Sequence, residues 1–523
     1  MASDLLPLDT PPPVWPVAEA YLVSVLGPLS STATRLSSAL NGTLPEKRVT
    51  VIAEYGWVIA VHQPGFPNPP GWPVTDENAQ VVQFESVYVT LPGLAAPQPL
   101  PQPIVSARHI LLPFDLGEDP GSFTNSFKCH VLAGIFPEAK ISLEKIGPRG
   151  GFLVLQFSTL PPKPWPHTVA GVPAYFMLAS RPRKSPRAQG VGVPPNNAVY
   201  VRHMDFRAVA DWRQLFAWIE AIFARLGVPI TEVMYWEDHV VIVLESCNAD
   251  LSALPRAVAN VECRYLCEQE MRRPPHPTTY RDEDETPGSP DEARYATLRP
   301  GVRISSPRSA ADPDNFYRTT AGVLVKDSHG AEFLTIASHG FAGRHPRGVL
   351  HPLGRDHACI GPGVHDVDHT GFGLVKLRDG AAFVNDTFQG EGVPRSVHLK
   401  RFAPVMGRPR NEAVFMDSPD TGCLEGSSSV TSFQRVPGDD PEAGEHRWIL
   451  TSWFYMGQNM EVAIPDGASG SAVWTEDGDV LGFFRYAPRS GPMKRWASCI
   501  AADELMSRFL SLADTAGRPE KHG

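Results

Sequence analysis

The sequence has no long apolar run, no excess of positive charge and no Cys-x-x-Cys pair. No stretch approaches the roughly 20 consecutive apolar residues that a membrane-spanning helix needs. Residues 1–15 are acidic and proline-rich, and they lack the basic and apolar regions of a secretory signal peptide. We therefore expect an intracellular, cytoplasmic protein that has no membrane partner.

The charge and the cysteines exclude further classes of protein. The formal net charge is −10, whereas proteins that bind nucleic acid carry a marked basic patch. The seven cysteines are scattered, and their number is odd. This spacing favours reduced, mostly buried thiols over a disulfide scaffold. We expect no nucleic-acid partner and no disulfide framework.

What the chain does contain is enough apolar sequence for more than one core. It has 523 residues, of which 42% are hydrophobic and 20% charged, as in ordinary globular proteins. Residues 271–295 are rich in proline and charge and have almost no apolar residues, which indicates a linker. We predict a multidomain chain: a loose tail at 1–16, an α+β domain at 17–270, the linker, an all-β domain at 296–515 and a tail at 516–523.

The α+β domain is predicted from hydrophobic periodicity. Its clearest element is a helix over residues 211–226, whose apolar side chains recur at helical spacing and indicate core packing. The other expected elements are a broken helix over 17–40, strands at 51–53, 57–61, 81–91 and 152–157, and a hairpin of 231–236 with 239–244. The domain contains no chemical motif, and its role stays open.

From about residue 296 the pattern changes to short strands separated by turns. We expect a hairpin of 321–325 with 332–337, strands at 373–377 and 496–500, and a final amphipathic helix over 502–512. Many short strands with one terminal helix suit a β-barrel architecture.

A serine between two glycines, Gly467-Ala468-Ser469-Gly470-Ser471, precedes two apolar runs joined by an Asp-Gly turn. The apolar runs predict a β-hairpin. Glycines at such a turn allow backbone N–H groups to point at one spot, where an oxyanion could form. Taken alone, the pattern fits an ordinary glycine and serine turn as well as it fits a nucleophile.

A second segment favours the nucleophile. Residues 333–339 read FLTIASH, a short strand that ends at His339. Together the two segments resemble the trypsin-like (chymotrypsin-fold) serine proteases, which carry L-T-A-A-H at the histidine and, farther along, G-D-S-G at the serine. The resemblance covers about residues 296–515, with Ala468 in place of the family's aspartate.

The resemblance implies a double β-barrel that closes with a terminal helix. It implies that Ser469 is the nucleophile, that His339 is its general base, and that the backbone N–H groups of Gly467 and Ser469 form the oxyanion hole. The reaction would be hydrolysis of a peptide or protein substrate through an acyl-serine, without a cofactor. The sequence does not indicate an oligomeric state.

The third member of the triad departs from the family. The family carries its aspartate at the head of a strand D-I-A-L-L/V-K-L, and here residues 371–377 read GFGLVKL, with Gly371 at the acid's position. The nearest carboxylates are those of Asp368 and Asp366. Asp368 would lie on the opposite face of a regular strand, so it could orient His339 only across a bulge or loop. The alternatives are Asp368 as substitute and a protease-fold pseudoenzyme that binds peptides or a partner protein.

The substrate pocket is also placed by resemblance. Ala463 would lie at its base, and Arg485 and Tyr486 would form its wall. An alanine base favours small or apolar side chains, whereas an intruding Arg485 would recognise acid.

A competing metal-stabilised site is conceivable in the next stretch, although its spacing fits no zinc pattern and polar loop side chains are the simpler interpretation. Its residues are His345, His351, His357, Cys359, His365, Asp366, Asp368 and His369.

Overall fold

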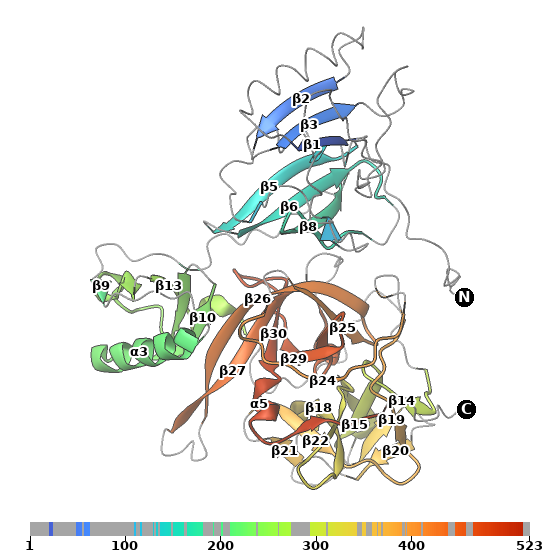
Figure 1. Cartoon of the computed structure of the whole chain (residues 1–523). Coiled ribbons are helices and arrows are strands. Elements are labelled where there is room, and N and C mark those ends of the chain that lie inside the picture. Colours follow the sequence, from blue (N-terminus) through green and yellow to red (C-terminus); the bar gives the residue numbers. More distant parts are fainter. Residues whose placement is uncertain are drawn as a thin grey trace. The chain divides into compact units, whose positions relative to one another are not determined.

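The computed structural model (Figure 1) describes residues 20–24, 49–54 and 57–62, separate segments between 109 and 201, and most of 210–515. In the last range the largest gap is 274–292, and shorter gaps include 342–347, 352–357, 368–369 and 457–463. The predicted linker therefore lies mostly outside the described residues, as does the strand expected over 81–91.

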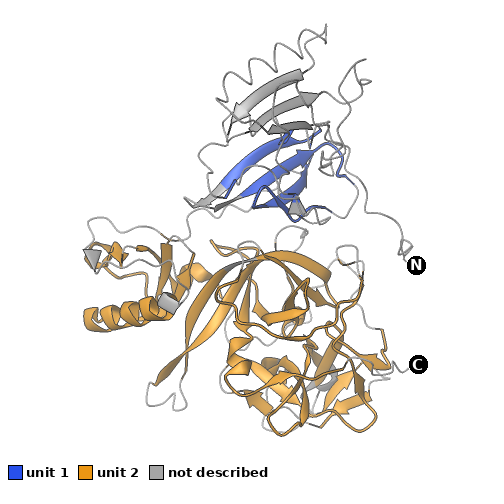
Figure 2. Cartoon of the chain, in the orientation of Figure 1, with its two compact units in different colours: residues 1–188 blue, residues 189–523 orange. Residues whose placement is uncertain are grey.

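The chain divides into two compact units, Met1–Ala188 and Gln189–Gly523 (Figure 2). This boundary differs from the one expected near residue 270. The reason is strand pairing: β10 (Ile230–Tyr235) pairs antiparallel with β26 (Gly422–Pro437), so that Glu232 lies opposite Gln434. Residues well before the predicted linker thus share a sheet with the C-terminal part of the chain.

The described residues of the first unit contain two sheets. The smaller has the order β1-β3-β2, and the larger has the order β4-β7-β8-β6-β5. Their strands are β1 (Ala20–Ser24), β2 (Val49–Glu54), β3 (Trp57–His62), β4 (His109–Ile110), β5 (Lys140–Gly147), β6 (Gly150–Phe157), β7 (Thr168–Val169) and β8 (Val172–Leu178). The strands expected at 51–53, 57–61 and 152–157 are confirmed. The helix expected over 17–40 is wrong at Ala20–Ser24, where tyrosine and valine favour a strand.

The second unit begins with a helix packed on a sheet. Helix α3 (Ala210–Leu226) and the hairpin of β10 with β11 (His239–Leu244) are confirmed, and β13 (Val261–Cys267) pairs parallel with β11. The apolar face of α3 is buried as expected except at Leu226, which is exposed, and the Phe216 ring stacks on Phe433 of β26, with centroids 4.2 Å apart. Short elements complete this region: β9 (Tyr200–Val201), η2 (Leu251–Ala253), β12 (Ala257–Val258) and α4 (Glu268–Met271).

The next strands form the first barrel. β15 pairs with β16 and β19, β19 with β20, β17 with β18, and β18 with β22. These strands lie in two sheets, and the bond from Arg378 N–H to Ile360 O, at 2.8 Å, joins the β20 side of one to the chain after β22 of the other. The bounds are β15 (Arg303–Ser309), β16 (Asp312–Thr320), β17 (Leu324–Lys326), β18 (Glu332–Ala337), β19 (Val349–His351), β20 (Ala358–Gly361), β21 (His365–Val367) and β22 (Phe372–Val375).

The second barrel has the strand order β25-β28-β29-β30-β27-β26, and pairing of β25 with β26 closes it. Its other strands are β25 (Ala413–Ser418), β27 (His446–Tyr455), β28 (Ala472–Thr475), β29 (Asp479–Tyr486) and β30 (Trp496–Ala501). The Phe372 ring of the first barrel meets Phe483 of the second edge to face at 4.8 Å. The expected mostly β, trypsin-like region is thus present: its second part is a barrel closed by strand pairing, and its first part consists of two sheets, seen around β18 in Figure 1.

The terminal helix is shorter than expected. α5 covers Asp503–Met506, and β31 (Ser511–Leu512) then pairs with β17. Phe509 has a φ of 59°, which a continuing right-handed helix does not allow. Short β14 (Thr297–Leu298), β23 (Ala382–Phe383) and β24 (Arg401–Phe402) complete the strands. No helix among the described residues is long and apolar enough to span a membrane.

The expectation that all cysteines are reduced is wrong for one pair. Cys247 and Cys267 form a disulfide, with their Cα atoms 5.1 Å apart. The two cysteines are far apart in sequence. They lie close in space because the parallel strands β11 and β13 place Leu244 opposite Cys267. The other five cysteines are not in disulfides, and Cys263 and Cys499 are buried.

Candidate functional site

Ser469 lies on a tight turn at the start of β28. The 3₁₀ turn η4 (Asp466–Ala468) precedes it, and Ser469 N–H donates to Asp466 O at 2.9 Å. Gly470 has a φ of 96°, and a Cβ atom there would lie 2.5 Å from Thr320 O. Only glycine therefore fits after the serine, both because of its backbone conformation and because of the close neighbouring strand.

The serine turn lies against the strand that leads to His339. Ser469 O accepts a hydrogen bond from Thr320 N–H at 3.0 Å. A Cβ atom on Gly470 would lie 3.0 Å from Ala337 N, at the end of β18. His339 follows in the 3₁₀ turn η3 (Ser338–Phe341) and is half-buried. Two segments far apart in sequence are thus brought together where the barrels meet.

Both donors of Ser469 are engaged within the protein. Its Oγ donates to Arg485 O of β29 at 2.8 Å, and its N–H, predicted for the oxyanion hole, donates to Asp466 O. The residue has no exposed surface. Gly467, the other predicted oxyanion residue, has its carbonyl oxygen bonded by Thr320 Oγ1 at 2.9 Å. In this conformation the serine is covered and its amide is not offered to a ligand.

Gly371 occupies the position where the resemblance would place the orienting acid; we call its surroundings the acid corner. Gly371 O accepts from Ser338 N–H at 2.9 Å, so this glycine lies beside the turn that carries the histidine. A Cβ atom on Gly371 would have Arg485 Nε as its nearest neighbour, at 3.9 Å. Arg485 Nη1 donates to Gln434 Oε1 at 2.7 Å, and burial lowers the pKa of this guanidinium. The structure places a cation beside the position where the family carries an acid.

The two aspartates predicted as substitutes have different outcomes. Asp368 lies outside the described residues, in the connection between β21 and β22. Asp366 is exposed on β21, opposite Gly373. β22 begins only at Phe372, and Thr370 and Gly371 before it form a turn. The role of Asp368 stays a prediction.

Two of the three residues predicted for the substrate pocket are described. Ala463 lies outside the described residues. The Arg485 side chain lies beside Gly371, and Tyr486 is buried with its hydroxyl accepting from Arg273 Nη1 at 2.8 Å. The hydroxyl of Tyr486 is thus engaged by another residue of the chain, and the pocket itself stays a prediction.

Arg273 belongs to a buried charge network that sequence reasoning missed. Its Nη2 contacts Glu232 Oε2 at 2.6 Å, and its Nε contacts Glu268. Burial opposes the charge on this guanidinium, but Tyr486, Glu232 and Glu268 raise its pKa overall. The only sequence signal was that Arg273 stands in a charged stretch, which suggested a solvated linker.

A second buried ion pair lies under the serine turn. Arg303 of β15 pairs with Asp420, which follows β25, and both side chains are almost fully buried. A Cβ atom on Gly467 would lie 2.9 Å from Arg303 Nη1 and 2.8 Å from Asp420 Oδ2. This pair joins one barrel to the other and explains why position 467 holds glycine.

The alternative metal stretch contains histidines with structural partners. His351 is buried, its Nε2 accepts from Tyr295 N–H at 3.0 Å, and its Nδ1 contacts Arg303 O at 2.7 Å. Cys359 Sγ donates to Gly361 O at 3.2 Å. His365 and Asp366 are exposed, and the remaining residues (His345, His357, Asp368 and His369) lie outside the description. Among the residues described, no group of three His, Cys, Asp or Glu is arranged to hold a metal ion.

Comparison with known proteins gives matches in structure alone. No protein-family model and no curated protein matches the chain. A glutamic-acid-specific serine protease matches 41% of this chain and 100% of its own, with 14% identity and a TM-score of 0.30. Thermobifida fusca Protease A matches 42% of this chain and 98% of its own, with 14% identity and a TM-score of 0.28. Cellulomonas bogoriensis chymotrypsin matches 42% of this chain and 100% of its own, with 12% identity and a TM-score of 0.28.

Proposed function

We propose that this chain is a serine peptidase-like hydrolase whose reaction centre is Ser469 with His339, held in a resting conformation. The observation that carries the proposal is the junction of the two barrels. There the Ser469 turn bonds to Thr320 and approaches Ala337, two residues before His339. Acyl transfer requires a nucleophile and a base, and the proximity of the two segments that carry Ser469 and His339 supports these roles.

The proposed reaction uses these two side chains and two backbone amides. His339 takes the proton of Ser469 Oγ as the oxygen attacks the carbonyl carbon of a peptide, and the imidazolium then protonates the leaving amine. Water hydrolyses the acyl-serine by the same route. The N–H groups of Gly467 and Ser469 stabilise the oxyanion. Asp368 is the proposed orienting acid for His339.

The resting conformation must change before this reaction can start. The Ser469 N–H must leave Asp466 O, which requires the peptide at the start of η4 to rotate, and Ser469 Oγ must leave Arg485 O. Each step breaks one buried hydrogen bond, whose net worth is about 1 kcal/mol. A bound peptide that supplies new hydrogen bonds offsets such a cost.

A second function, a pseudoenzyme that binds a peptide or protein, is favoured by the acid corner. Arg485 lies beside Gly371, and a guanidinium there opposes the positive charge that His339 gains as a base. Losing the orienting acid lowers turnover by about 10⁴-fold in trypsin-like enzymes. If Asp368 does not replace that acid, the fold retains its binding surfaces with little chemistry.

A fluorophosphonate probe separates the two functions, because it reacts only with an activated serine. We expect slow labelling of the wild type and complete loss in Ser469→Ala. Ser471→Ala is the matched control, since Ser471 is equally buried in the same turn and should leave labelling unchanged. An unlabelled wild type, with the fold intact by circular dichroism, supports the binding module instead.

A further inference from the structure

A short segment begins at the last residue of β13 and covers residues 267–273. It contacts the end of β29, the strand that was assigned to the substrate pocket. We call it the strap. Arg273 Nη1 donates to Tyr486 OH at 2.8 Å, at the end of β29. Glu270 O lies 2.7 Å from where a Cβ atom on Gly491 would stand, and Arg272 Cγ lies 3.2 Å from it. The strap therefore contacts both Tyr486 and the loop that follows it.

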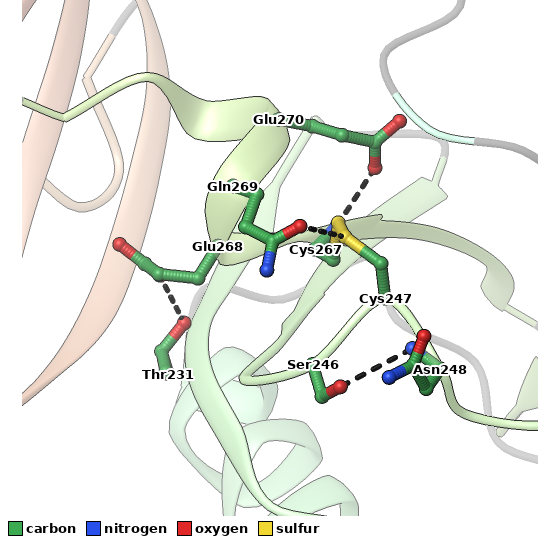
Figure 3. Close-up of a disulfide and its surroundings, with 8 residues drawn as sticks. All are labelled: Thr231, Ser246, Cys247, Asn248, Cys267, Glu268, Gln269 and Glu270. Atoms are coloured by element: carbon green, nitrogen blue, oxygen red, sulfur yellow. Dashed lines mark hydrogen bonds between the residues drawn. A yellow bond between two sulfur atoms is a disulfide. The ribbon is translucent and has the colours of Figure 1, made fainter.

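The strap is fixed at its first residue. Cys267 is bonded to Cys247, whose residue is exposed on the loop after β11 (Figure 3). The N–H of Cys267 also donates to Glu270 Oε2 at 2.8 Å, and Glu268 Oε2 accepts from Thr231 Oγ1 at 2.6 Å. Figure 3 shows these contacts around the start of α4, so the disulfide holds the end from which the strap extends.

At the far end of the strap, the guanidinium of Arg273 contacts the buried carboxylate of Glu232. Glu232 projects from β10 with 1% of its side chain exposed. Its Oε1 accepts from Trp453 Nε1 at 2.8 Å and from Ser432 Oγ at 2.6 Å, while its Oε2 receives Arg273 Nη2. The carboxylate is thus oriented by two donors from the second barrel and leaves one oxygen for a guanidinium.

Arg272 shows that the strap is bent to reach this site. It has a φ of 51°, a left-handed conformation that is unfavourable for a residue other than glycine. Met271, just before it, is fully buried. The chain turns at Arg272, and the side chain of Arg273 then reaches Glu232.

We propose that Glu232 and Tyr486 form a binding site for the arginine side chain of a peptide, which Arg273 fills from within the chain while the Cys247–Cys267 disulfide holds the strap. Reduction by a dithiol transfers two electrons and two protons to the pair, giving two thiols on the protein and a disulfide in the reductant. The freed strap then exchanges with a peptide arginine. That this peptide is a substrate rests on the proposed function, whereas the site itself does not.

The first experiment tests the binding site without measuring catalytic activity. In Arg273→Ala the acidic site loses its cation, so we expect the melting temperature to fall and N-acetyl-arginine amide to restore part of it. N-acetyl-citrulline amide is the matched neutral probe and should not. The double variant Glu232→Gln/Arg273→Ala should lose the rescue. Equal effects of the two probes, or rescue that persists in the double variant, would overturn the proposal.

The second experiment tests whether the Cys247–Cys267 disulfide holds the strap in place. It can be done even if Arg273→Ala does not fold. We expect reduction with dithiothreitol to raise hydrogen exchange at residues 268–273 at least tenfold, and Cys247→Ser to show that exchange without reductant. Cys359→Ser, which alters a cysteine remote in sequence from the strap, should respond as the wild type does. If hydrogen exchange at residues 268–273 is unchanged after both thiols have been alkylated, the disulfide does not hold the strap. Raised exchange with no fluorophosphonate labelling in either state supports the strap and rejects the hydrolase.

Discussion

The serine end and the acid end of the candidate site are built in opposite ways. At the serine end, Gly470 and Gly467 each stand where any side chain would collide with a neighbour, and Ser469 is hydrogen-bonded through its hydroxyl, its amide and its carbonyl. At the acid end, Gly371 leaves space that Arg485 approaches. One end has closely packed geometry, and the other has a glycine and a guanidinium where the resemblance to trypsin-like proteases would place an acid.

The difference shows that geometry and chemistry can be separated within one site. The serine turn also joins the two barrels, because Thr320 of β16 bonds to both Ser469 and Gly467. Its glycines are therefore required for folding whether or not the protein is an enzyme. Gly371 has a φ of 79°, so its backbone also favours glycine, whereas the space beside it is limited only by Arg485 Nε at 3.9 Å. A preserved serine turn is for this reason weaker support for catalysis than a preserved acid.

The largest effect is expected from Gly470→Ala. A non-glycine residue in the left-handed region costs about 1–2 kcal/mol. The added methyl group would also meet the backbone at Thr320 O and Ala337 N, which adds about 1–3 kcal/mol of overpacking. Urea unfolding of the purified variant measures the sum, and the loss should be accompanied by loss of fluorophosphonate labelling.

Gly330→Ala isolates the backbone contribution. Gly330 has a φ of 81° in the turn between β17 and β18, and a Cβ atom there would meet nothing within 4 Å. We expect it to lose only about 1–2 kcal/mol and to keep its labelling. Equal losses in the two variants would show that the serine turn does not lie against the first barrel as described.

The next effect tests the acid end by restoring its charge. Gly371→Asp must adopt a φ of 79°, which costs about 1–2 kcal/mol of stability, and its carboxylate would stand beside Arg485 and pair with it, so labelling should not increase. In Gly371→Asp/Arg485→Ser the carboxylate would be available to His339, and we expect labelling to rise at least tenfold, toward the roughly 10⁴-fold worth of an orienting acid. Rates of fluorophosphonate labelling for the two variants measure the difference.

The single variant Arg485→Ser provides the control for that comparison. The bond from Ser469 Oγ goes to the backbone carbonyl of residue 485, so this variant keeps it. A rise in Gly371→Asp alone equal to that of the double variant would mean that Arg485 does not compete for the acid. A rise in Arg485→Ser alone would point to Asp368 as an acid already in place.

Local sequence rules account for the serine end, and long-range pairing accounts for what they miss. Periodicity predicted α3 and β18, and the glycine pattern predicted the turn at Ser469, because each depends on neighbouring residues. Arg273 pairs with Glu232 across 41 residues of sequence and with Tyr486 across 213, and no local pattern encodes such contacts. The disulfide was missed for the same reason.

The boundary between the two compact units also differs from the one that composition predicted. Residues 271–295 have the composition of a linker, yet Arg273 within them is buried between charged partners. A charged residue that is solvated in a linker and one that is paired in a core look alike in sequence. The position of Arg485 illustrates the same limit, since the alignment assigned it to a pocket wall and the structure places it beside Gly371.

The smallest effect is expected from Thr320→Val, which probes how the resting turn is held. The change removes the hydroxyl that donates to Gly467 O and keeps a side chain of similar shape, so the protein should lose about 1 kcal/mol of unfolding free energy. Because the Gly467 carbonyl is then less restrained, the peptides of η4 should rotate more readily toward the open oxyanion geometry. We therefore expect labelling to become a few-fold faster even as stability falls. Thr320→Ser, which retains the hydroxyl, should label at the wild-type rate, and slower labelling in the valine variant would show that this hydrogen bond supports the reactive conformation rather than the resting one.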